Sequence, residues 1–148
     1  METSTDAKDN EILSLLLKDS SLTKKQIARK LSLPLTTVHN RIKKMEQAGV
    51  IRGYHASADW KKLGFDLCAI VSITVKYETK AYSQDETAKT IRALSGVEWV
   101  GIVAGTTDII AKVRKKDSED LNDFLLNRLR KVAGVDTTTT IVVLKEYA

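Results

Sequence analysis

Residues 33–51, with the sequence LPLTTVHNRIKKMEQAGVI, predict a single amphipathic helix. The large apolar side chains recur at intervals of three or four residues, which places them on one stripe of an α-helix. Pro34 suits the beginning of such a helix, and Gly49 suits the position just after its end. We therefore expect a helix over residues 34–48, with a buried stripe formed by Leu35, Val38, Ile42 and Met45.

The opposite face of this predicted helix is polar, and its charges are positive. At about 100° per residue it presents hydrogen-bonding and cationic groups, and Glu46 is the only acid of the segment. A helix that faces only water normally mixes charges of both signs on its exposed side. The face therefore suits a negatively charged partner that also offers hydrogen-bonding groups. Its members are Thr36, Asn40, Lys43 and Gln47, with Thr37, His39 and Lys44 on the flanks.

The segment before this helix completes a helix-turn-helix pattern. Thr23 and Gln26 have the spacing of a capping box, in which each side chain satisfies the other residue's backbone N–H, and they open a short helix. A brief turn at residues 32–33 then leads into the helix described above. Upstream, Asp6 caps a further helix. Downstream, residues 50–56 predict a strand that forms one arm of a short wing.

The chain has 148 residues and a net charge of +5, and this charge is unevenly distributed. Residues 1–62 hold 12 Lys/Arg and 7 Asp/Glu, whereas residues 63–148 hold 12 of each. Such an asymmetry is typical of a basic module that meets a polyanion, joined to a neutral module with another role. The alternative is a Lys-rich solvated surface. We expect a DNA-binding domain at residues 1–56, a linker at 57–64 and a second domain at 65–148.

Composition argues against several other classes of protein. The longest apolar runs fall short of the roughly 20 residues of a membrane-spanning helix, and the polar N-terminus is unlike a secretory signal. Cys68 is the only cysteine, which rules out an intrachain disulfide and fits a reducing cytoplasm. We therefore expect a cytoplasmic protein without a membrane partner, in which Cys68 is a small buried hydrophobic residue.

Residues 65–148 predict an α+β domain with the order β-α-β-β-α-β. Ser83 caps the first helix, which ends at Gly96, and Asp117 caps the second, which ends near Gly134. This order is the ferredoxin-like arrangement, a sheet with both helices on one face. Because the first strand is apolar on both faces, we expect a second copy of the chain to cover the open face in a homodimer. The strands are expected at residues 65–77, 97–104, 109–113 and 136–145.

An α-helix fits the major groove of DNA, where side chains near its N-terminus reach base edges. Asn40 has the donor and the acceptor that adenine needs, and His39 suits guanine. Thr36 or Thr37 suits a thymine methyl group or a base acceptor. Arg41 lies beside the apolar stripe and suits either a phosphate or an internal acid. Phosphate contacts are expected from Lys24, Lys25, Lys43, Lys44 and Arg52.

These motifs resemble those of the Lrp/AsnC, or feast/famine, family of transcriptional regulators. The resemblance covers nearly the whole chain. It implies a winged helix-turn-helix joined to a ferredoxin-like, RAM-type domain that dimerises through its sheet, often forms octamers and commonly binds an amino acid between subunits. One departure is Pro34, where the family often has a capping serine. The segments that carry the resemblance are DAKDNEIL (6–13), QIA (26–28), VHNRIKKME (38–46), GVIRGY (49–54), GTTD (105–108), GV (134–135) and IVVL (141–144).

The resemblance also implies an effector site at the turn formed by Gly105, Thr106, Thr107 and Asp108. In the family this Gly-x-x-Asp turn lines the site, usually with an aromatic residue before the aspartate, where this chain has Thr107. The implied effector is an amino acid or a related small molecule. From the residues alone, the same turn is explained as a hairpin, with glycine for positive φ and aspartate for a local side-chain bond. The two roles are compatible.

Two other functions compete with that of a sequence-specific regulator. For an enzyme, the sequence offers only His39 and His55, both in the basic part, and no Cys/His cluster at metal-ligand spacing. We expect no catalytic residues, no metal and no cofactor, although sirohaem decarboxylases resemble this architecture and would place His or Arg in a cavity of the second domain. An architectural protein would bind phosphates without reading bases. The exposed side chains that favour base readout are Thr36, Asn40 and Gln47.

Overall fold

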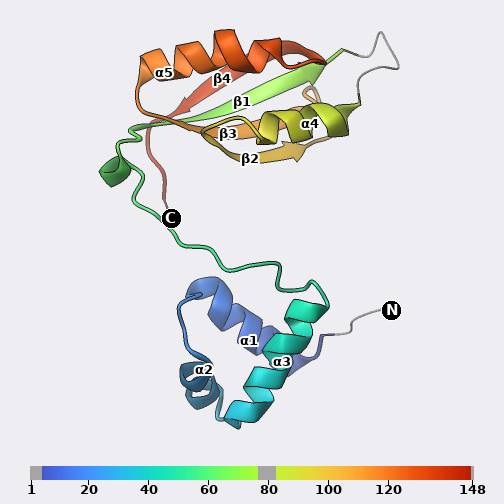
Figure 1. Ribbon diagram of the computed structural model, residues 1–148, viewed down its shortest axis with the longest axis vertical. Coiled ribbons are helices and arrows are strands. Elements are labelled where there is room, and N and C mark those ends of the chain that lie inside the picture. Colours follow the sequence, from blue (N-terminus) through green and yellow to red (C-terminus); the bar gives the residue numbers. More distant parts are fainter. Residues whose placement is uncertain (1–4, 77–82, 148) are drawn as a thin grey trace. The chain divides into compact units, whose positions relative to one another are not determined.

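The computed structural model describes residues 5–76 and 83–147, and the chain divides into two compact units. The first unit comprises Met1–Ala58 and the second comprises Asp59–Ala148. Figure 1 shows the helices of the first unit and the sheet and helices of the second. Among the described residues, no helix is both long enough and apolar enough to cross a membrane.

The first unit consists of α1 (Ala7–Lys18), α2 (Lys24–Leu31) and α3 (Leu35–Gln47). Two of these helices start at capping boxes, in which two side chains bond each other's backbone N–H groups. Asp6 and Asp9 form the box of α1, and Thr23 and Gln26 form the predicted box of α2. α3 follows Pro34 without a side-chain cap and is one residue shorter at each end than predicted.

The apolar sides of α1, α2 and α3 pack together into one core. Ile12, Ile27 and Val38 are fully buried, and most of the predicted stripe of α3 lies beside them. Leu35 is the exception, because half of its surface is exposed. Side chains of an α-helix tilt toward its N-terminus. The side chain of this first helical residue therefore extends past the end of the packed stripe.

The strand predicted for residues 50–56 is wrong, because the structure assigns these residues to no strand. The backbone N–H groups of Val50 and Ile51 instead donate to the carbonyl oxygen of Met45, at 2.9 and 3.1 Å. Further along, the hydroxyl of Ser20 donates to the backbone oxygen of His55 at 3.1 Å. A strand needs a second strand for its backbone bonds. The described residues of the first unit offer none, so the segment bonds to α3 and to the turn after α1 instead.

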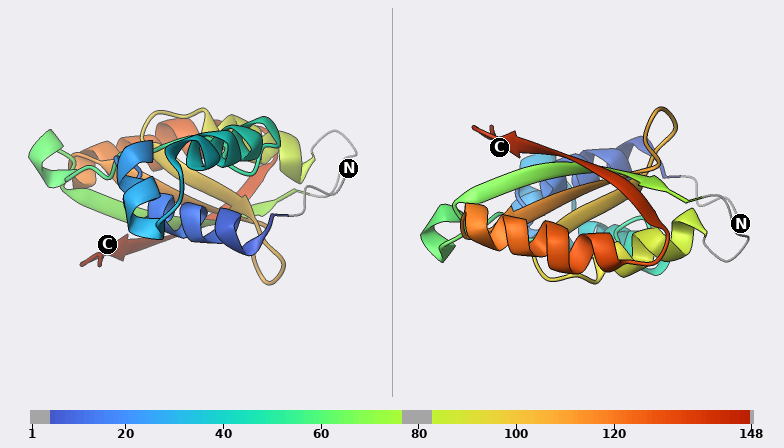
Figure 2. Two further views of the ribbon diagram at one scale, coloured as in Figure 1. Left: turned by 90° about the horizontal axis from the view of Figure 1, so that it is seen from below. Right: turned by 90° about the horizontal axis from the view of Figure 1, so that it is seen from above.

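The second unit has the predicted βαββαβ order and an antiparallel sheet with the strand order β2-β3-β1-β4. The two views of Figure 2 show α4 and α5 on the same side of this sheet. After α5, the helical path continues through a π-helical turn at Phe124–Arg128 and a 3-10 turn at Leu129–Lys131, so the second predicted helix is irregular. In chain order the elements are β1 (Leu67–Val75), α4 (Gln84–Arg92), β2 (Val97–Ile102), β3 (Ile109–Lys115), α5 (Ser118–Asp123) and β4 (Val135–Val143).

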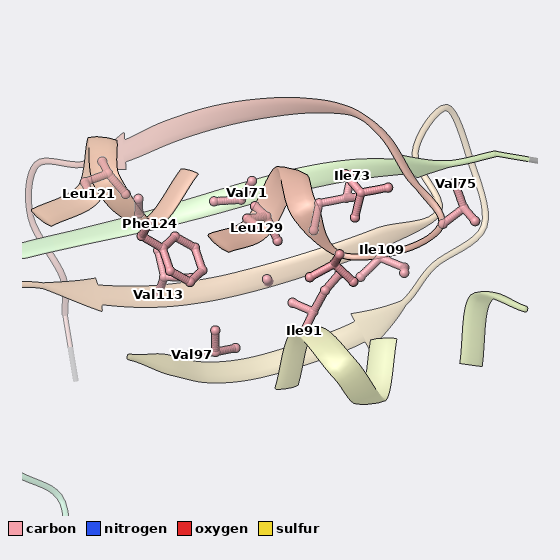
Figure 3. Close-up of a cluster of buried hydrophobic side chains, with 14 residues drawn as sticks. Val71, Ile73, Val75, Ile91, Val97, Ile109, Val113, Leu121, Phe124 and Leu129 are labelled. Atoms are coloured by element: carbon pink, nitrogen blue, oxygen red, sulfur yellow. The ribbon is translucent and has the colours of Figure 1, made fainter. Parts of the chain in front are cut away.

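Alternate residues of β1 and β3 face the helices and are buried. Ile91 projects toward them from α4, and Phe124 and Leu129 project from the helical path that follows β3 (Figure 3). A period of two is what a strand with one buried face requires. These contacts form the core of the second unit. The strand residues in it are Ala69, Val71, Ile73, Val75, Val97, Ile109, Ala111, Val113 and Val135.

The other residues of these strands form what we call the open face of the sheet. In the register of the sheet, Ile70 of β1 lies opposite Lys112 of β3 on one side and opposite Ile141 of β4 on the other. Lys112 in turn lies opposite Trp99 of β2. Directly paired residues of antiparallel strands lie on the same face. Ile141 is 57% exposed and Trp99 is 51% exposed. In a single chain, the open face therefore leaves large apolar side chains exposed to solvent.

An ion-pair cluster lies on the same face. Arg114 Nε lies 2.9 Å from a carboxylate oxygen of Glu98, and Lys112 Nζ lies 2.8 Å from one of Glu146. The bond to Glu146 raises the pKa of Lys112, so this cation keeps its charge. Cys68, beside the cluster, is buried as predicted, and burial raises the pKa of its thiol.

Gly96 is a position where the fold requires glycine. Its φ is +82°, and a Cβ there would lie 2.6 Å from the backbone oxygen of Arg114. We predict that Gly96→Ala lowers the free energy of unfolding by about 2–4 kcal/mol, since φ strain and a displaced backbone both contribute. Gly64, with the same φ and open space around it, is the matched control, and Gly64→Ala should cost only about 1 kcal/mol. Urea unfolding followed by circular dichroism measures both, and equal losses would contradict the prediction.

Candidate nucleic-acid interface and effector turn

The outer face of α3 is exposed, and its cations form no ion pair with any other residue that the structure describes. Thr36, Asn40 and Gln47 lie in the open, whereas Thr37 is half-buried. Within the part of the chain that the structure describes, four of the predicted phosphate contacts form no ion pair. These four are exposed: Lys25, Lys43, Lys44 and Arg52.

Glu46, the one acid of this segment, bonds to the extended residues that follow α3. The hydroxyl of Tyr54 donates to its carboxylate at 2.8 Å. Burial, followed by this bond to Glu46, raises the pKa of Tyr54 to about 12. The tyrosine therefore stays protonated and keeps donating at neutral pH. The sequence analysis did not identify this pair, although the eight-residue separation across a helix end is short enough to suggest it.

Arg41 is held by the two acids that cap α1. Its Nη1 atom lies 2.7 Å from Asp6 Oδ2 and 2.8 Å from Asp9 Oδ1. Asp9 is buried, and both carboxylates raise the pKa of Arg41. Of the two roles that the sequence leaves open for Arg41, the structure therefore shows the internal pairing. Asp9 was missed by the sequence analysis, although its spacing from Asp6 is that of a capping box.

Lys24 and His39 meet across the turn between α2 and α3. Lys24 Nζ lies 3.1 Å from His39 Nδ1. Lys24 is half-buried, whereas His39 is exposed on the flank of the outer face of α3. α1 and α2 therefore each bind one side chain of α3, α1 through Arg41 and α2 through His39.

The turn between β2 and β3 is tied to β1 and α4 by its own side chains. Asp108 accepts hydrogen bonds from the backbone N–H of Val75 at 2.8 Å and from the amide of Gln84 at 3.0 Å. The hydroxyl of Thr107 donates to the carbonyl oxygen of Ile73 at 2.9 Å. These bonds reach residues 24 to 34 positions away in the chain, so they differ from the local side-chain bond of the hairpin interpretation.

The other two residues predicted to bind an effector, Gly105 and Thr106, are exposed at the tip of this turn. The structure thus brings the four predicted residues together but gives them different surroundings. Gln84, which the sequence analysis did not name, belongs to the same group through its bond to Asp108. In the described residues, no group of three His, Cys, Asp or Glu side chains is placed to hold a metal ion.

Comparisons with known proteins match this two-part layout. The family model described as winged helix-turn-helix DNA-binding matches residues 5–52. The model described as Lrp/AsnC ligand binding domain matches residues 68–148. The chain belongs to the Lrp/AsnC family. An uncharacterised HTH-type transcriptional regulator of Pyrococcus furiosus is 39% identical to it, over 93% of this chain and 89% of that one. The HTH-type transcriptional regulator FL11 of Pyrococcus abyssi is 33% identical, over 99% and 94%.

Solved structures share the fold of this Lrp/AsnC protein. Bacillus subtilis LrpC superimposes with a TM-score of 0.83, with 28% identity and 99% of both chains covered. Escherichia coli AsnC gives a TM-score of 0.80, with 25% identity over 97% of this chain and 94% of that one. A Neisseria meningitidis regulator solved as a complex with L-methionine has the same fold, with a TM-score of 0.88 and 24% identity over 98% and 93%.

The family membership decides the class of function. This Lrp/AsnC protein is a DNA-binding transcriptional regulator, and its relatives are regulators rather than enzymes. The sirohaem decarboxylase alternative is therefore dropped. The match to a ligand binding domain indicates that a small molecule modulates the regulator. The α+β fold class is confirmed, with a first domain that matches the winged helix-turn-helix model and a ferredoxin-like second domain, although residues 50–56 form no wing strand.

We expect acid to lower the stability of the first unit by protonating Asp6. The N–H of Asp9 and the Arg41 guanidinium hold the pKa of Asp6 below its usual 3.8. A carboxyl group whose pKa is lowered by folding stabilises the protein above its unfolded pKa, and this contribution is lost as the pH falls through the folded pKa. We predict that stability falls with acid below pH 3.8, and that Asp6→Asn makes this fall shallower. Thermal unfolding at a series of pH values measures it, and identical pH profiles for both proteins would contradict the prediction.

Proposed function

We propose that this Lrp/AsnC protein binds a two-fold symmetric operator as a homodimer, or as a higher oligomer such as an octamer, in the cytoplasm. An amino acid or a related small molecule modulates this binding. Residues 1–56 bind DNA, residues 57–64 link the domains, and residues 65–148 bind the effector and dimerise. The observation that carries the proposal is the exposed outer face of α3, which combines unpaired cations with side chains that can read bases.

In this proposal α3 enters the major groove of double-stranded DNA. Asn40, exposed on the centre of the outer face, bonds an adenine by accepting through its amide oxygen and donating through its amide nitrogen. Thr36 and Thr37 contact a thymine methyl group or a base acceptor. Base contacts of this kind specify a sequence, which an architectural protein would not do.

Phosphate contacts orient the helix in the groove. Lys25, Lys43, Lys44 and Arg52 are exposed and have no ion-pair partner among the described residues, so each is available to a phosphate. Arg41 has a different role in this proposal. Its guanidinium already lies between two carboxylates, and it positions α3 from within the protein.

The dimer forms through the open face of the sheet. Ile70, Ile141 and Trp99 give this face an apolar centre that an isolated chain would leave in water. A two-fold dimer buries the same patch of both copies. It also presents two copies of α3, which favours an operator with two half-sites separated by about one helical turn of DNA or a multiple.

The effector binds at the turn between β2 and β3. The turn lies in the segment that matches the Lrp/AsnC ligand binding domain, and a regulator of the same fold was solved as a complex with L-methionine. Gly105 and Thr106 are the exposed members of the turn and contact the ligand directly. Thr107 and Asp108 hold the turn in shape through their bonds to β1 and α4.

The proposed readout predicts different effects for Asn40 and Lys43. Asn40→Ala should weaken binding to a preferred duplex by about 1–3 kcal/mol and relax its sequence preference, because a base contact is lost. Lys43→Ala should weaken binding to every duplex and reduce the salt slope by about one, because one phosphate contact is lost. The measurement is titration of a labelled duplex from upstream of the protein's own gene, with scrambled competitor, across a salt series.

The controls in that titration decide between regulator and architectural protein. If the wild-type protein binds the scrambled duplex equally well, sequence readout is refuted and the architectural alternative is supported. If Asn40→Ala weakens all duplexes equally, Asn40 does not read a base. Absence of binding at low salt would refute the proposed interface altogether.

The proposed dimer predicts opposite outcomes for two adjacent residues of β4. Ile141 lies on the open face, whereas Val142, which pairs with Ala69, lies on the face toward the helices, and the two are 57% and 47% exposed. Ile141→Asp places a charge in the proposed interface and should yield monomers, while Val142→Asp should leave the assembly intact. Sedimentation velocity measures both. Intact dimers of Ile141→Asp would contradict the proposed interface.

A further inference from the structure

The contact between Lys24 and His39 restricts the protonation state of the histidine ring. A lysine ammonium has three N–H donors and no acceptor. His39 Nδ1 lies 3.1 Å from Lys24 Nζ, so the ring nitrogen must accept this bond through its lone pair. A neutral imidazole carries its single proton on one nitrogen. The proton of His39 is therefore on Nε2, and the sequence alone leaves this tautomer undefined.

The same contact determines which way the donor points. Nδ1 and Nε2 lie on either side of the Cε1 atom, so a ring that turns Nδ1 toward α2 turns Nε2–H away from it. Among the residues that the structure describes, none bonds to His39 Nε2. His39 itself is exposed and belongs to the helix whose outer face carries Asn40 and Lys43. Its free donor is therefore available to a ligand of that face.

We propose that Lys24 is a positioning residue that fixes His39 as the Nε2–H tautomer, so that His39 donates to a guanine in the major groove. This inference rests on the proposed function, because it requires α3 to lie in that groove. Guanine presents two neighbouring acceptors there, N7 and O6. Cytosine presents the N4 amino donor instead, and a ring whose outward nitrogen is itself a donor cannot bond to it. The fixed tautomer thus converts an ambiguous side chain into one that selects an acceptor.

This proposal gives Lys24 a different role from its neighbour Lys25. Both lie in the first turn of α2, and both are candidates for phosphate contacts from the sequence. Lys25 is exposed and unpaired among the described residues, whereas Lys24 is half-buried and directed at His39. Lys25 therefore serves as the matched control, with the same chemistry, the same helix turn and a different partner.

The first experiment tests the tautomer in the free, full-length protein. Nitrogen-15 NMR of the histidine ring distinguishes a protonated Nε2 from a protonated Nδ1, at a pH where the ring is neutral. We expect His39 to have protonated Nε2 and unprotonated Nδ1, and Lys24→Met to increase the share of the other tautomer. Protonated Nδ1 in the wild-type protein would overturn the inference without any reference to DNA.

The second experiment tests the base contact with two isosteric replacements. A duplex selected from a randomised pool by the full-length protein is compared with copies in which 7-deazaguanine, which lacks the N7 acceptor, replaces each guanine in turn. At one position the wild-type protein should lose roughly three- to tenfold in affinity, which is the effect of one neutral hydrogen bond. His39→Gln places an amide near the position of Nε2 and should retain part of this discrimination. His39→Asn reaches only as far as Nδ1 and should bind both duplexes equally.

The lysine variants complete the test. Lys24→Met should weaken the discrimination against 7-deazaguanine and leave the salt slope nearly unchanged, whereas Lys25→Met should reduce the slope by about one and leave the discrimination intact. If Lys24→Met behaves like Lys25→Met, Lys24 is a phosphate contact and the inference is wrong, while the proposed function stands. If the pool yields no preferred sequence, the proposed readout fails and the guanine contact fails with it.

Discussion

Burial of one stripe of α3 is the constraint on which the DNA-binding unit depends. Val38, Ile42 and Met45 are buried against α1 and α2, and this fixes the rotation of the helix about its own axis. Rotation in turn decides which residues face outward, because neighbours along the chain are separated by about 100°. The two flanks are then held by specific bonds, Arg41 to the caps of α1 and His39 to Lys24. A rigid outer face of this kind is what base readout requires.

A similar constraint governs the second unit, with a period of two in place of 3.6. Val71 and Ile73 must face the helices, so Ile70 and Ser72, which alternate with them along the strand, must face the other way. The open face is therefore an unavoidable product of a four-stranded sheet with helices on one side. Its large apolar residues and its ion-pair cluster are placed by the same strand register that builds the core. The family's fold and the proposed dimer thus arise from one alternation in the sequence.

The parts of the fold that depend on near neighbours could be predicted from the sequence. The capping box of Thr23 and Gln26 is one such part, and the helices are others. Both depend on residues that are three or four positions apart in the sequence. The strand at residues 50–56 could not be judged in that way, because a strand exists only where a distant segment pairs with it. Leu35 shows the same limit on a smaller scale. Periodicity predicts which side of the helix its side chain lies on, but not that the packed surface ends before it covers this residue.

Side-chain partners were harder to predict than the elements that carry them. Arg41 lies 35 residues from Asp6 and 32 from Asp9, and Lys24 lies 15 from His39. Long, flexible cations reach several groups of opposite charge, so the sequence predicted that they lie near the interface but not what they bind. Charge patterning therefore predicted a basic surface on this unit, but not which of its cations bond within the protein. The structure shows that Arg41 pairs with the acids that cap α1 and that Lys24 contacts His39.

The bonds of Asp108 limit how an amino acid can be recognised at the turn. Its carboxylate already accepts from Val75 and Gln84, and hydrogen bonds to a charged group are worth about 1.5–3 kcal/mol each. An effector ammonium that replaced these donors would lose much of what it gained, and it would leave a backbone N–H of β1 unpaired. In the proposed effector site, recognition therefore depends on Gly105 and Thr106, which are exposed at the tip of the turn.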